Sequence, residues 1–187
     1  MINAEVDLTN IVLETERLII RAWKETDLED FYEYAKVDGV GQMAGWNPHQ
    51  SVQESKTILK MFIKGKNKFA LELKENHKVI GSLGLEKMSL SLGGEYDNLA
   101  GREIGYVLNK AYWGRGLMPE AVKAVIAYCF QNEKYDYLIC SHSVTNNQSK
   151  RVIEKCGFRF VKERSRVMAN GEEHLSLYYV LDNPTTI

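Results

Sequence analysis

A glycine-rich turn that leads directly into an amphipathic helix restricts the fold of this chain more than any other feature. Residues 112–118 read Tyr-Trp-Gly-Arg-Gly-Leu-Met, and apolar residues then recur at helical spacing to about Asn132. Glycines let a backbone approach an anion closely, and the free N–H groups and dipole of a helix N-terminus favour negative charge there. The turn therefore predicts an anion site in an α/β domain, although two glycines before a helix also occur in turns that bind nothing.

Several other classes of site and location do not fit the sequence. The turn lacks the Gly-Lys-Ser/Thr of an NTPase loop and the three-glycine pattern of a dinucleotide site. The net charge of −1, with scattered Lys and Arg, does not suit a nucleic-acid binder. No apolar run has the roughly 20 residues of a membrane span, and no secretory signal is evident, so we expect a soluble, cytoplasmic protein without nucleic-acid or membrane partners. Three scattered cysteines indicate core positions, with no metal site.

The remaining patterns predict one domain spanning residues 1–187. Its elements follow the order strand, two helices, three strands, helix, strand, helix and two strands. Strands are expected at 13–22, 69–73, 79–85, 102–108 and 137–144, and in two arms joined at the favoured turn Asn170-Gly171. Helices are expected from Thr26 and from Ser51, each with a glutamate three residues later, and at 117–132 and 146–156. Residues 38–50 and 89–101 are predicted to be loops.

Four segments together resemble the GNAT superfamily of N-acetyltransferases, in particular the branch that contains the ribosomal-protein N-terminal acetyltransferases. They are residues 14–21, residues 103–108, the turn 113–118, and residues 146–158 with the pattern Asn-x-x-Ser-x-Arg-Val-Ile-Glu-Lys-x-Gly-Phe. The turn matches the family pattern Q/R-x-x-G-x-G/A at Gly116 but has Trp113 and Met118 at its ends. The four segments occur in the family's order.

The resemblance implies an α/β fold with a twisted mixed sheet of about seven strands and about four helices, splayed between the fourth and fifth strands. Acetyl-CoA is the implied cosubstrate, bound in the splay with its pantetheine arm along the fourth strand and its pyrophosphate on the turn. The residues implied to bind it are Tyr106, Val107, Leu108, Trp113, Gly114, Arg115, Gly116, Leu117, Met118, Asn146 and Ser149. Asn146 is also a favoured helix N-cap residue, and both roles stay open.

Two residues are candidates for proton transfer. Ser149 occupies the position where, by resemblance, a hydroxyl protonates the departing thiolate; otherwise it is an exposed serine in a first helical turn. The tyrosine that many GNAT enzymes use for this step is replaced here by Ile153, so thiolate departure without direct protonation also stays open. Glu103, on the fourth strand, is the candidate general base, acting through water, or else a strand-edge carboxylate paired with Arg102 or a lysine.

The acceptor of the acetyl group is least constrained by the sequence. We expect a primary amine, most favourably a protein or peptide N-terminal α-amine; a small-molecule amine and a module that binds acyl-CoA without catalysis are the alternatives. Candidate acceptor contacts come from the loop 38–50 and the last hairpin, although each could equally be a packing residue. They are Trp46, His49, Met168, His174 and Tyr178. Either a monomer or a homodimer fits.

Overall fold

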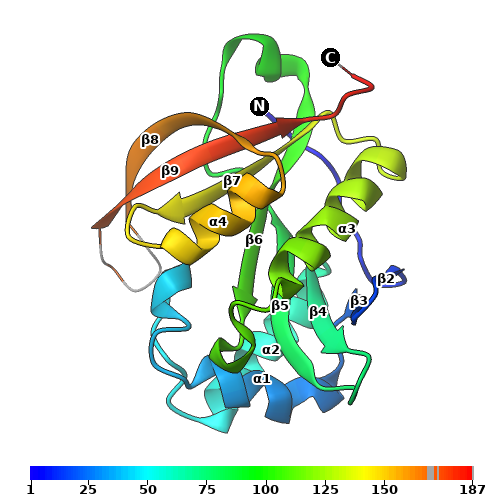
Figure 1. The fold of residues 1–187 in the computed structure, drawn as a ribbon, viewed down its shortest axis with the longest axis vertical. Coiled ribbons are helices and arrows are strands. Elements are labelled where there is room, and N and C mark those ends of the chain that lie inside the picture. The colour runs from blue at the N-terminus through cyan, green and yellow to red at the C-terminus, as the bar shows by residue number, and fades with distance from the viewer. Residues whose placement is uncertain (168–170, 172, 187) are drawn as a thin grey trace.

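The structure is a computed structural model, and it describes residues 1–167, 171 and 173–186 (Figure 1). Its strands are β1 Ile2–Asn3, β2 Val12–Glu14, β3 Leu18–Ala22, β4 Lys68–Leu73, β5 Val79–Glu86, β6 Ala100–Leu108, β7 Tyr137–Ser143, β8 Arg159–Val167 and β9 Glu173–Asp182. Its α-helices are α1 Leu28–Ala35, α2 Val52–Gly65, α3 Leu117–Gln131 and α4 Asn147–Lys155. The predicted α/β class, four helices and order of elements are confirmed.

Nine strands form one mixed sheet. They follow the order β2-β3-β4-β5-β6-β7-β9-β8, with β1 paired to β6. The pairing of β6 with β7 is parallel and covers only Gly101–Ile104 against Tyr137–Cys140, whereas the other edge of β6 stays paired with β5 to Leu108. Beyond Ile104 the two strands separate. This is the splay that the sequence analysis predicted between its fourth and fifth strands, which correspond to β6 and β7.

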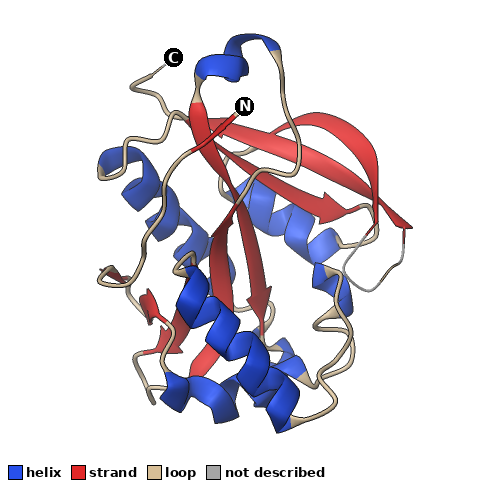
Figure 2. Cartoon of the chain, turned by 180° about the vertical axis from the view of Figure 1, so that it is seen from behind, coloured by secondary structure: helices blue, strands red, loops and turns tan. Residues whose placement is uncertain are grey.

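Helices cover both faces of the sheet (Figures 1 and 2). Apolar residues of α3 and α4 form the largest core cluster with the sheet, whereas α1 and α2 pack with Trp23, Ala70 and Val79 in a second cluster. The segment 87–99, which includes most of the loop predicted at 89–101, contains the short 3-10 helix Gly94–Asn98. Its Met88, Leu90 and Tyr96 pack against residues of β7 and β9 in a third cluster, so this segment is part of the fold.

Two local predictions were wrong. Residues 13–22 do not form one strand, because a turn divides them into β2 and β3; Glu120 of α3 accepts hydrogen bonds there from Thr15 Oγ1 at 2.5 Å and from Arg17 N at 2.9 Å. The first α-helix begins at Leu28 after the 3-10 turn Glu25–Asp27, rather than at the predicted Thr26. In contrast, the predicted cap at Ser51 is confirmed, since its hydroxyl accepts from Glu54 N at 3.2 Å.

Candidate active site

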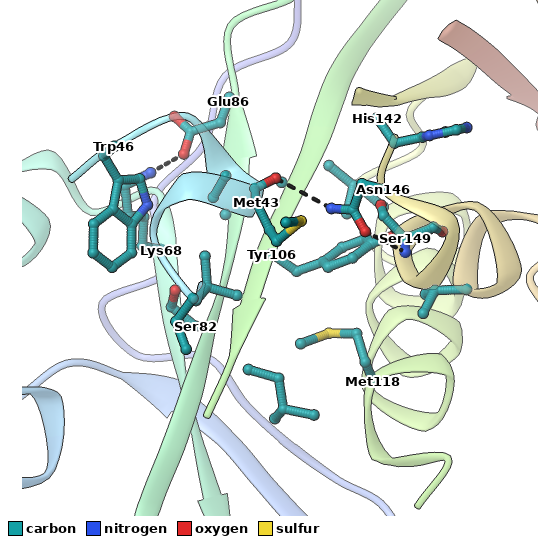
Figure 3. Close-up of a pocket in the computed structure, with 18 of the residues that line it drawn as sticks. Met43, Trp46, Lys68, Ser82, Glu86, Tyr106, Met118, His142, Asn146 and Ser149 are labelled. Atoms are coloured by element: carbon teal, nitrogen blue, oxygen red, sulfur yellow. Dashed lines mark hydrogen bonds and ion pairs between the residues drawn. The ribbon is translucent and has the colours of Figure 1, made fainter. Parts of the chain in front are cut away.

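A cleft of about 1480 Å³ opens where β6 and β7 separate. Its walls come from the end of β6, the first turn of α3, the N-terminal half of α4, and the loop between α1 and α2 (Figure 3). Most of the residues proposed from the sequence as site residues line it. They are Trp46, His49, Glu103, Tyr106, Val107, Leu108, Trp113, Gly114, Gly116, Leu117, Met118, Asn146 and Ser149.

The glycine-rich turn has the geometry of an anion site at one end of this cleft. Gly114 and Gly116 both have φ of +77°, a left-handed conformation that other residues adopt at a cost. Gly116 is the N-cap residue of α3, and no side chain among the described residues caps that helix. Its first backbone N–H groups are thus available to an anionic ligand, and the anion site itself stays a prediction. The indole of Trp113 donates to Leu108 O at 2.8 Å and joins the turn to the end of β6.

The free edge of β6 forms one wall of the cleft. Tyr106 and Val107 lie beyond Ile104, the last residue of β6 that pairs with β7. Their backbone groups on this edge can therefore pair with an extended, amide-rich ligand as with an added strand. The carbonyl of Leu108, predicted to be equally open, already accepts the hydrogen bond from the Trp113 indole.

Asn146 connects the two sides of the cleft. Its Oδ1 accepts a hydrogen bond from Ser149 N at 3.0 Å, so it is the N-cap residue of α4, one of its two predicted roles. Its Nδ2 donates to Met43 O at 3.2 Å, in the loop between α1 and α2 (Figure 3). One buried side chain thus fixes both the helix that carries Ser149 and the loop that carries Trp46 and His49.

Ser149 faces the cleft from the first turn of α4 and is in contact with β6. Its Oγ lies 2.8 Å from the hydroxyl oxygen of Tyr106, which also lies 3.2 Å from Ser149 O. Burial raises the pKa of Tyr106 well above its ordinary value, so this hydroxyl keeps its proton at neutral pH. The sequence analysis assigned only the backbone of Tyr106 to the site and therefore missed this contact.

Glu103 is a buried carboxylate at the inner end of the cleft. Its Oε2 accepts hydrogen bonds from Ser89 N at 3.0 Å and Ser89 Oγ at 2.7 Å, and its Oε1 accepts one from Ser141 Oγ at 2.7 Å. Arg166 Nη1 lies 3.9 Å from Oε1. Neither the neighbouring Arg102 nor a lysine pairs with it in the described part of the chain, in contrast to the alternative considered from the sequence. Three donors and one cation hold this carboxylate in a fixed position.

The loop between α1 and α2 places the aromatic rings of Trp46 and His49 in another wall of the cleft. His49 Nδ1 lies 2.7 Å from Ser55 Oγ, and the ring of His49 lies 5.1 Å from that of Trp46. Burial lowers the pKa of His49, so the imidazole is neutral at pH 7. Lys68 and Glu86 form an ion pair in the same wall (Figure 3), and the sequence analysis identified neither of them.

Three predicted site residues do not line the described cleft. Arg115 is not part of the lining, and its guanidinium lies 5.0 Å from the centre of the Tyr112 ring. Tyr178 is 1% exposed and belongs to the third core cluster. His174 Nδ1 lies 3.4 Å from Ser143 Oγ, outside the lining of the cleft. Met168, like Asn170 of the predicted turn, lies outside the described residues.

Groups that would support other chemistries are not assembled in the described part of the chain. Cys129, Cys140 and Cys156 are buried free thiols, and burial raises the pKa of Cys156 to about 11, which disfavours the nucleophilic thiolate. Within the described residues no cluster of His, Cys, Asp and Glu could hold a metal ion. None of the described helices is long and apolar enough to cross a membrane.

The family is decided by comparison with known proteins. The model of the acetyltransferase (GNAT) domain matches residues 17–159. The chain belongs to the GNAT acetyltransferase family. This confirms the resemblance found in the sequence, and it makes the protein an acetyltransferase whose acceptor the family alone does not identify.

Individual relatives agree with this membership. The uncharacterized N-acetyltransferase p20 of Bacillus licheniformis is 27% identical over 79% of this chain and 82% of its own. A GNAT-family acetyltransferase of Bacillus anthracis has a TM-score of 0.80 and 24% identity, covering 92% of this chain and 99% of that one. The ribosomal-protein-S5-alanine acetyltransferase of Vibrio fischeri has a TM-score of 0.72 and 20% identity, covering 95% and 100%. The two solved structures share the fold of this chain.

Proposed function

We propose that this GNAT protein transfers the acetyl group of acetyl-CoA to the N-terminal α-amine of a protein or peptide, by direct attack in a ternary complex. The observation that carries the proposal is the single cleft that contains an uncapped helix N-terminus, the free edge of β6 and the Ser149 hydroxyl. The helix N-terminus suits a pyrophosphate, the free edge of β6 suits an amide-rich arm, and the Ser149 hydroxyl suits a departing thiolate. These three ligand groups follow one another in that order along one ligand. Buried cysteines give no alternative covalent route through a thiol.

The acceptor is inferred from the energy of amine deprotonation. At pH 7.4 a lysine-like amine costs about 4 kcal/mol to neutralise, whereas an α-amine with a pKa near 7.8 costs about 0.5 kcal/mol. Glu103 is the one carboxylate proposed as a base, and three hydrogen bonds already occupy it. Because the proposed base is so constrained, the site suits the amine whose deprotonation costs the least free energy. The name of the Vibrio fischeri structure, an acetyltransferase of ribosomal-protein alanine, supports the same choice.

The experiment that tests this function is thiol release from acetyl-CoA by the purified protein, measured against N-terminal peptides, lysine peptides, polyamines and aminoglycosides. The expected result is turnover with N-terminal peptides, with the α-amine acetylated in the product. Turnover confined to a small amine would overturn the acceptor assignment and keep the acetyltransferase. Tight binding of acetyl-CoA with no turnover across the panel would favour a binding module instead.

Replacing Gly114 with alanine tests the proposed pyrophosphate turn. Gly94, in the segment 87–99 far from the turn, also has a positive φ, of +60°, and open surroundings. Both substitutions carry the same backbone cost of about 1–2 kcal/mol. Only Gly114→Ala should raise the Kd for acetyl-CoA, by about 10-fold, because its methyl group enters the space that the phosphates need. Calorimetric titration measures both variants, and equal Kd values would remove this turn from the site.

Replacing Glu103 with glutamine tests the proposed base. Glutamine keeps the size of the side chain but cannot take a proton, so kcat/KM for an N-terminal peptide is expected to fall about 100-fold at pH 7. The loss should shrink as the pH rises past about 7.8, because the α-amine then loses its proton without a base. The control is Glu95→Gln, at an exposed glutamate of the segment 87–99. A Glu103→Gln enzyme with full activity at pH 7 would rule out the base.

A further inference from the structure

The hydroxyl of Tyr106 spans the splay between β6 and α4. The ring starts from β6 and ends at α4, where its oxygen lies 2.8 Å from Ser149 Oγ (Figure 3). The residue is packed against the main core cluster, together with the α3 residues Leu117 and Met118. Its ring therefore has a fixed direction, and the hydroxyl can serve as a stationary partner for a side chain on the opposite wall.

The contact matters for the chemistry because position 153, on the same helix, carries no hydroxyl group. Ile153, where the sequence analysis noted the absence of the family's usual acidic tyrosine, is 1% exposed and belongs to the core. A hydroxyl on α4 is instead supplied by Ser149, one turn nearer the N-terminus of the helix. A serine side chain can adopt more than one staggered χ1 rotamer and its hydroxyl hydrogen rotates about the C–O bond, so by itself the O–H points toward a neighbouring sulfur only part of the time. A fixed partner would remove that freedom.

We propose that the Tyr106 hydroxyl donates a hydrogen bond to Ser149 Oγ and thereby directs the Ser149 proton toward the departing sulfur. Tyr106 is in this role a positioning residue, and Ser149 is the residue that touches the reacting atom. The inference rests on the proposed acetyl transfer, since it concerns the leaving group of that reaction. A tyrosine side chain on β6 thus takes part in the step for which α4 has no tyrosine of its own.

Every proton in this step has a donor and an acceptor. The amine nitrogen forms a bond to the acetyl carbon as the carbon–sulfur bond breaks, and the sulfur takes the Ser149 proton. The Ser149 oxygen regains a proton from the amine nitrogen through water, so the products are the amide and the free thiol. Tyr106 keeps its own proton throughout, because burial raises its pKa far above neutral pH.

The Tyr106 hydroxyl has two possible acceptors on Ser149, and each leads to a different expected result. The Tyr106 hydroxyl has one proton, and Ser149 O lies 3.2 Å away, against 2.8 Å for Ser149 Oγ. If the proton goes to that carbonyl, the Ser149 hydroxyl must donate back to Tyr106, and its proton is then not directed at the sulfur. In that case Tyr106 merely anchors α4 to β6, and its loss should act on binding and stability rather than on turnover.

The experiment is a double-mutant cycle on Tyr106→Phe and Ser149→Ala, measured with an acceptor that the wild-type protein acetylates. Phenylalanine keeps the ring that packs in the core, so we expect a folded variant with an unchanged KM for acetyl-CoA and a kcat about 10-fold lower. In the Ser149→Ala background the same substitution should cause no further loss, because its partner is already absent. The matched control, Tyr128→Phe on α3, removes the hydroxyl that donates to Glu133 and should leave kcat unchanged.

Proton transfer itself gives a second readout, the solvent deuterium isotope effect on single-turnover acetyl transfer. A normal effect in the wild-type protein should diminish in both single variants, which a loss of packing alone would not cause. Equal losses from Tyr106→Phe in the two backgrounds, or full activity of that variant, would overturn the positioning role and leave the acetyltransferase intact. A wild-type protein that releases no thiol with any acceptor would overturn the proposed function and this inference together.

Discussion

The Ser149→Ala variant is expected to turn over acetyl-CoA about 100-fold more slowly than the wild-type protein at pH 7, the lower end of the effect of general acid catalysis. The thiolate leaves most easily when it receives a proton, and Ser149 is the hydroxyl of α4 that lines the cleft, with its backbone N–H fixed by Asn146. The Kd for acetyl-CoA should change less than about twofold, because the lost interaction exists mainly in the transition state. Single-turnover kinetics and calorimetry measure the two quantities separately.

The control for this variant is Ser165→Ala, at an exposed serine of the edge strand β8. It removes the same hydroxyl group and should leave both quantities unchanged. A Ser149→Ala protein with wild-type kcat would mean that the thiolate departs without direct protonation, the alternative that the sequence left open. A large rise in Kd at constant kcat would instead place Ser149 in the binding of the pantetheine arm.

Parts of the site that depend on consecutive residues could be predicted from the sequence. The turn at Gly114 and Gly116 is one example, since positive φ and a helix start are both local properties. The cap at Asn146 is another, because an N-cap needs only a short polar side chain and the N–H three residues later. These features require no knowledge of how the strands are ordered.

The contacts that connect distant segments could not be predicted in the same way. Ser141 meets Glu103 because β7 pairs with β6, and Ser89 meets it because the segment 87–99 packs against β7 and β9. Nothing at Ser89 itself distinguishes it from an ordinary loop serine. Likewise the Tyr106 hydroxyl reaches Ser149 only once the register of β6 and the position of α4 are fixed. The alternation of side chains along a strand restricts Tyr106 to one face of the sheet, but it does not identify the residue on the opposite wall.

A buried charge network was also missing from the sequence analysis, although it lies beside the wall that carries His49. Arg21 on β3 donates to both oxygens of Asp27 at 2.9 Å and to Glu72 on β4 at 2.6 Å. All three residues are less than 10% exposed, and Lys24 N also donates to Asp27 at 2.8 Å. The network joins the sheet to the start of α1, the helix that precedes the loop carrying Trp46 and His49.

Replacing Arg21 with methionine is therefore expected to lower the free energy of unfolding at pH 7 by about 3–5 kcal/mol, because two buried carboxylates lose their cation. Chemical denaturation measures this quantity. The control Lys74→Met breaks the exposed pair with Glu14 and should cost less than about 1 kcal/mol. Equal costs for the two variants would mean that solvent, not Arg21, compensates Asp27 and Glu72.

The pH dependence gives an independent check on the same network. Burial raises the pKa of Glu72, but hydrogen bonds from His77 and Arg21 outweigh it, and the net pKa is lower than the ordinary value of 4.5. A carboxyl with a lowered pKa in the folded state stabilises the protein above its unfolded pKa, and this contribution is lost as the pH falls through the folded value. The difference between wild type and Arg21→Met should then be largest near neutral pH and shrink below about pH 4, because the variant's unpaired carboxylates can take up protons. A difference that stays constant from pH 7 to pH 3 would show that Arg21 acts through packing of its aliphatic stem instead of its charge.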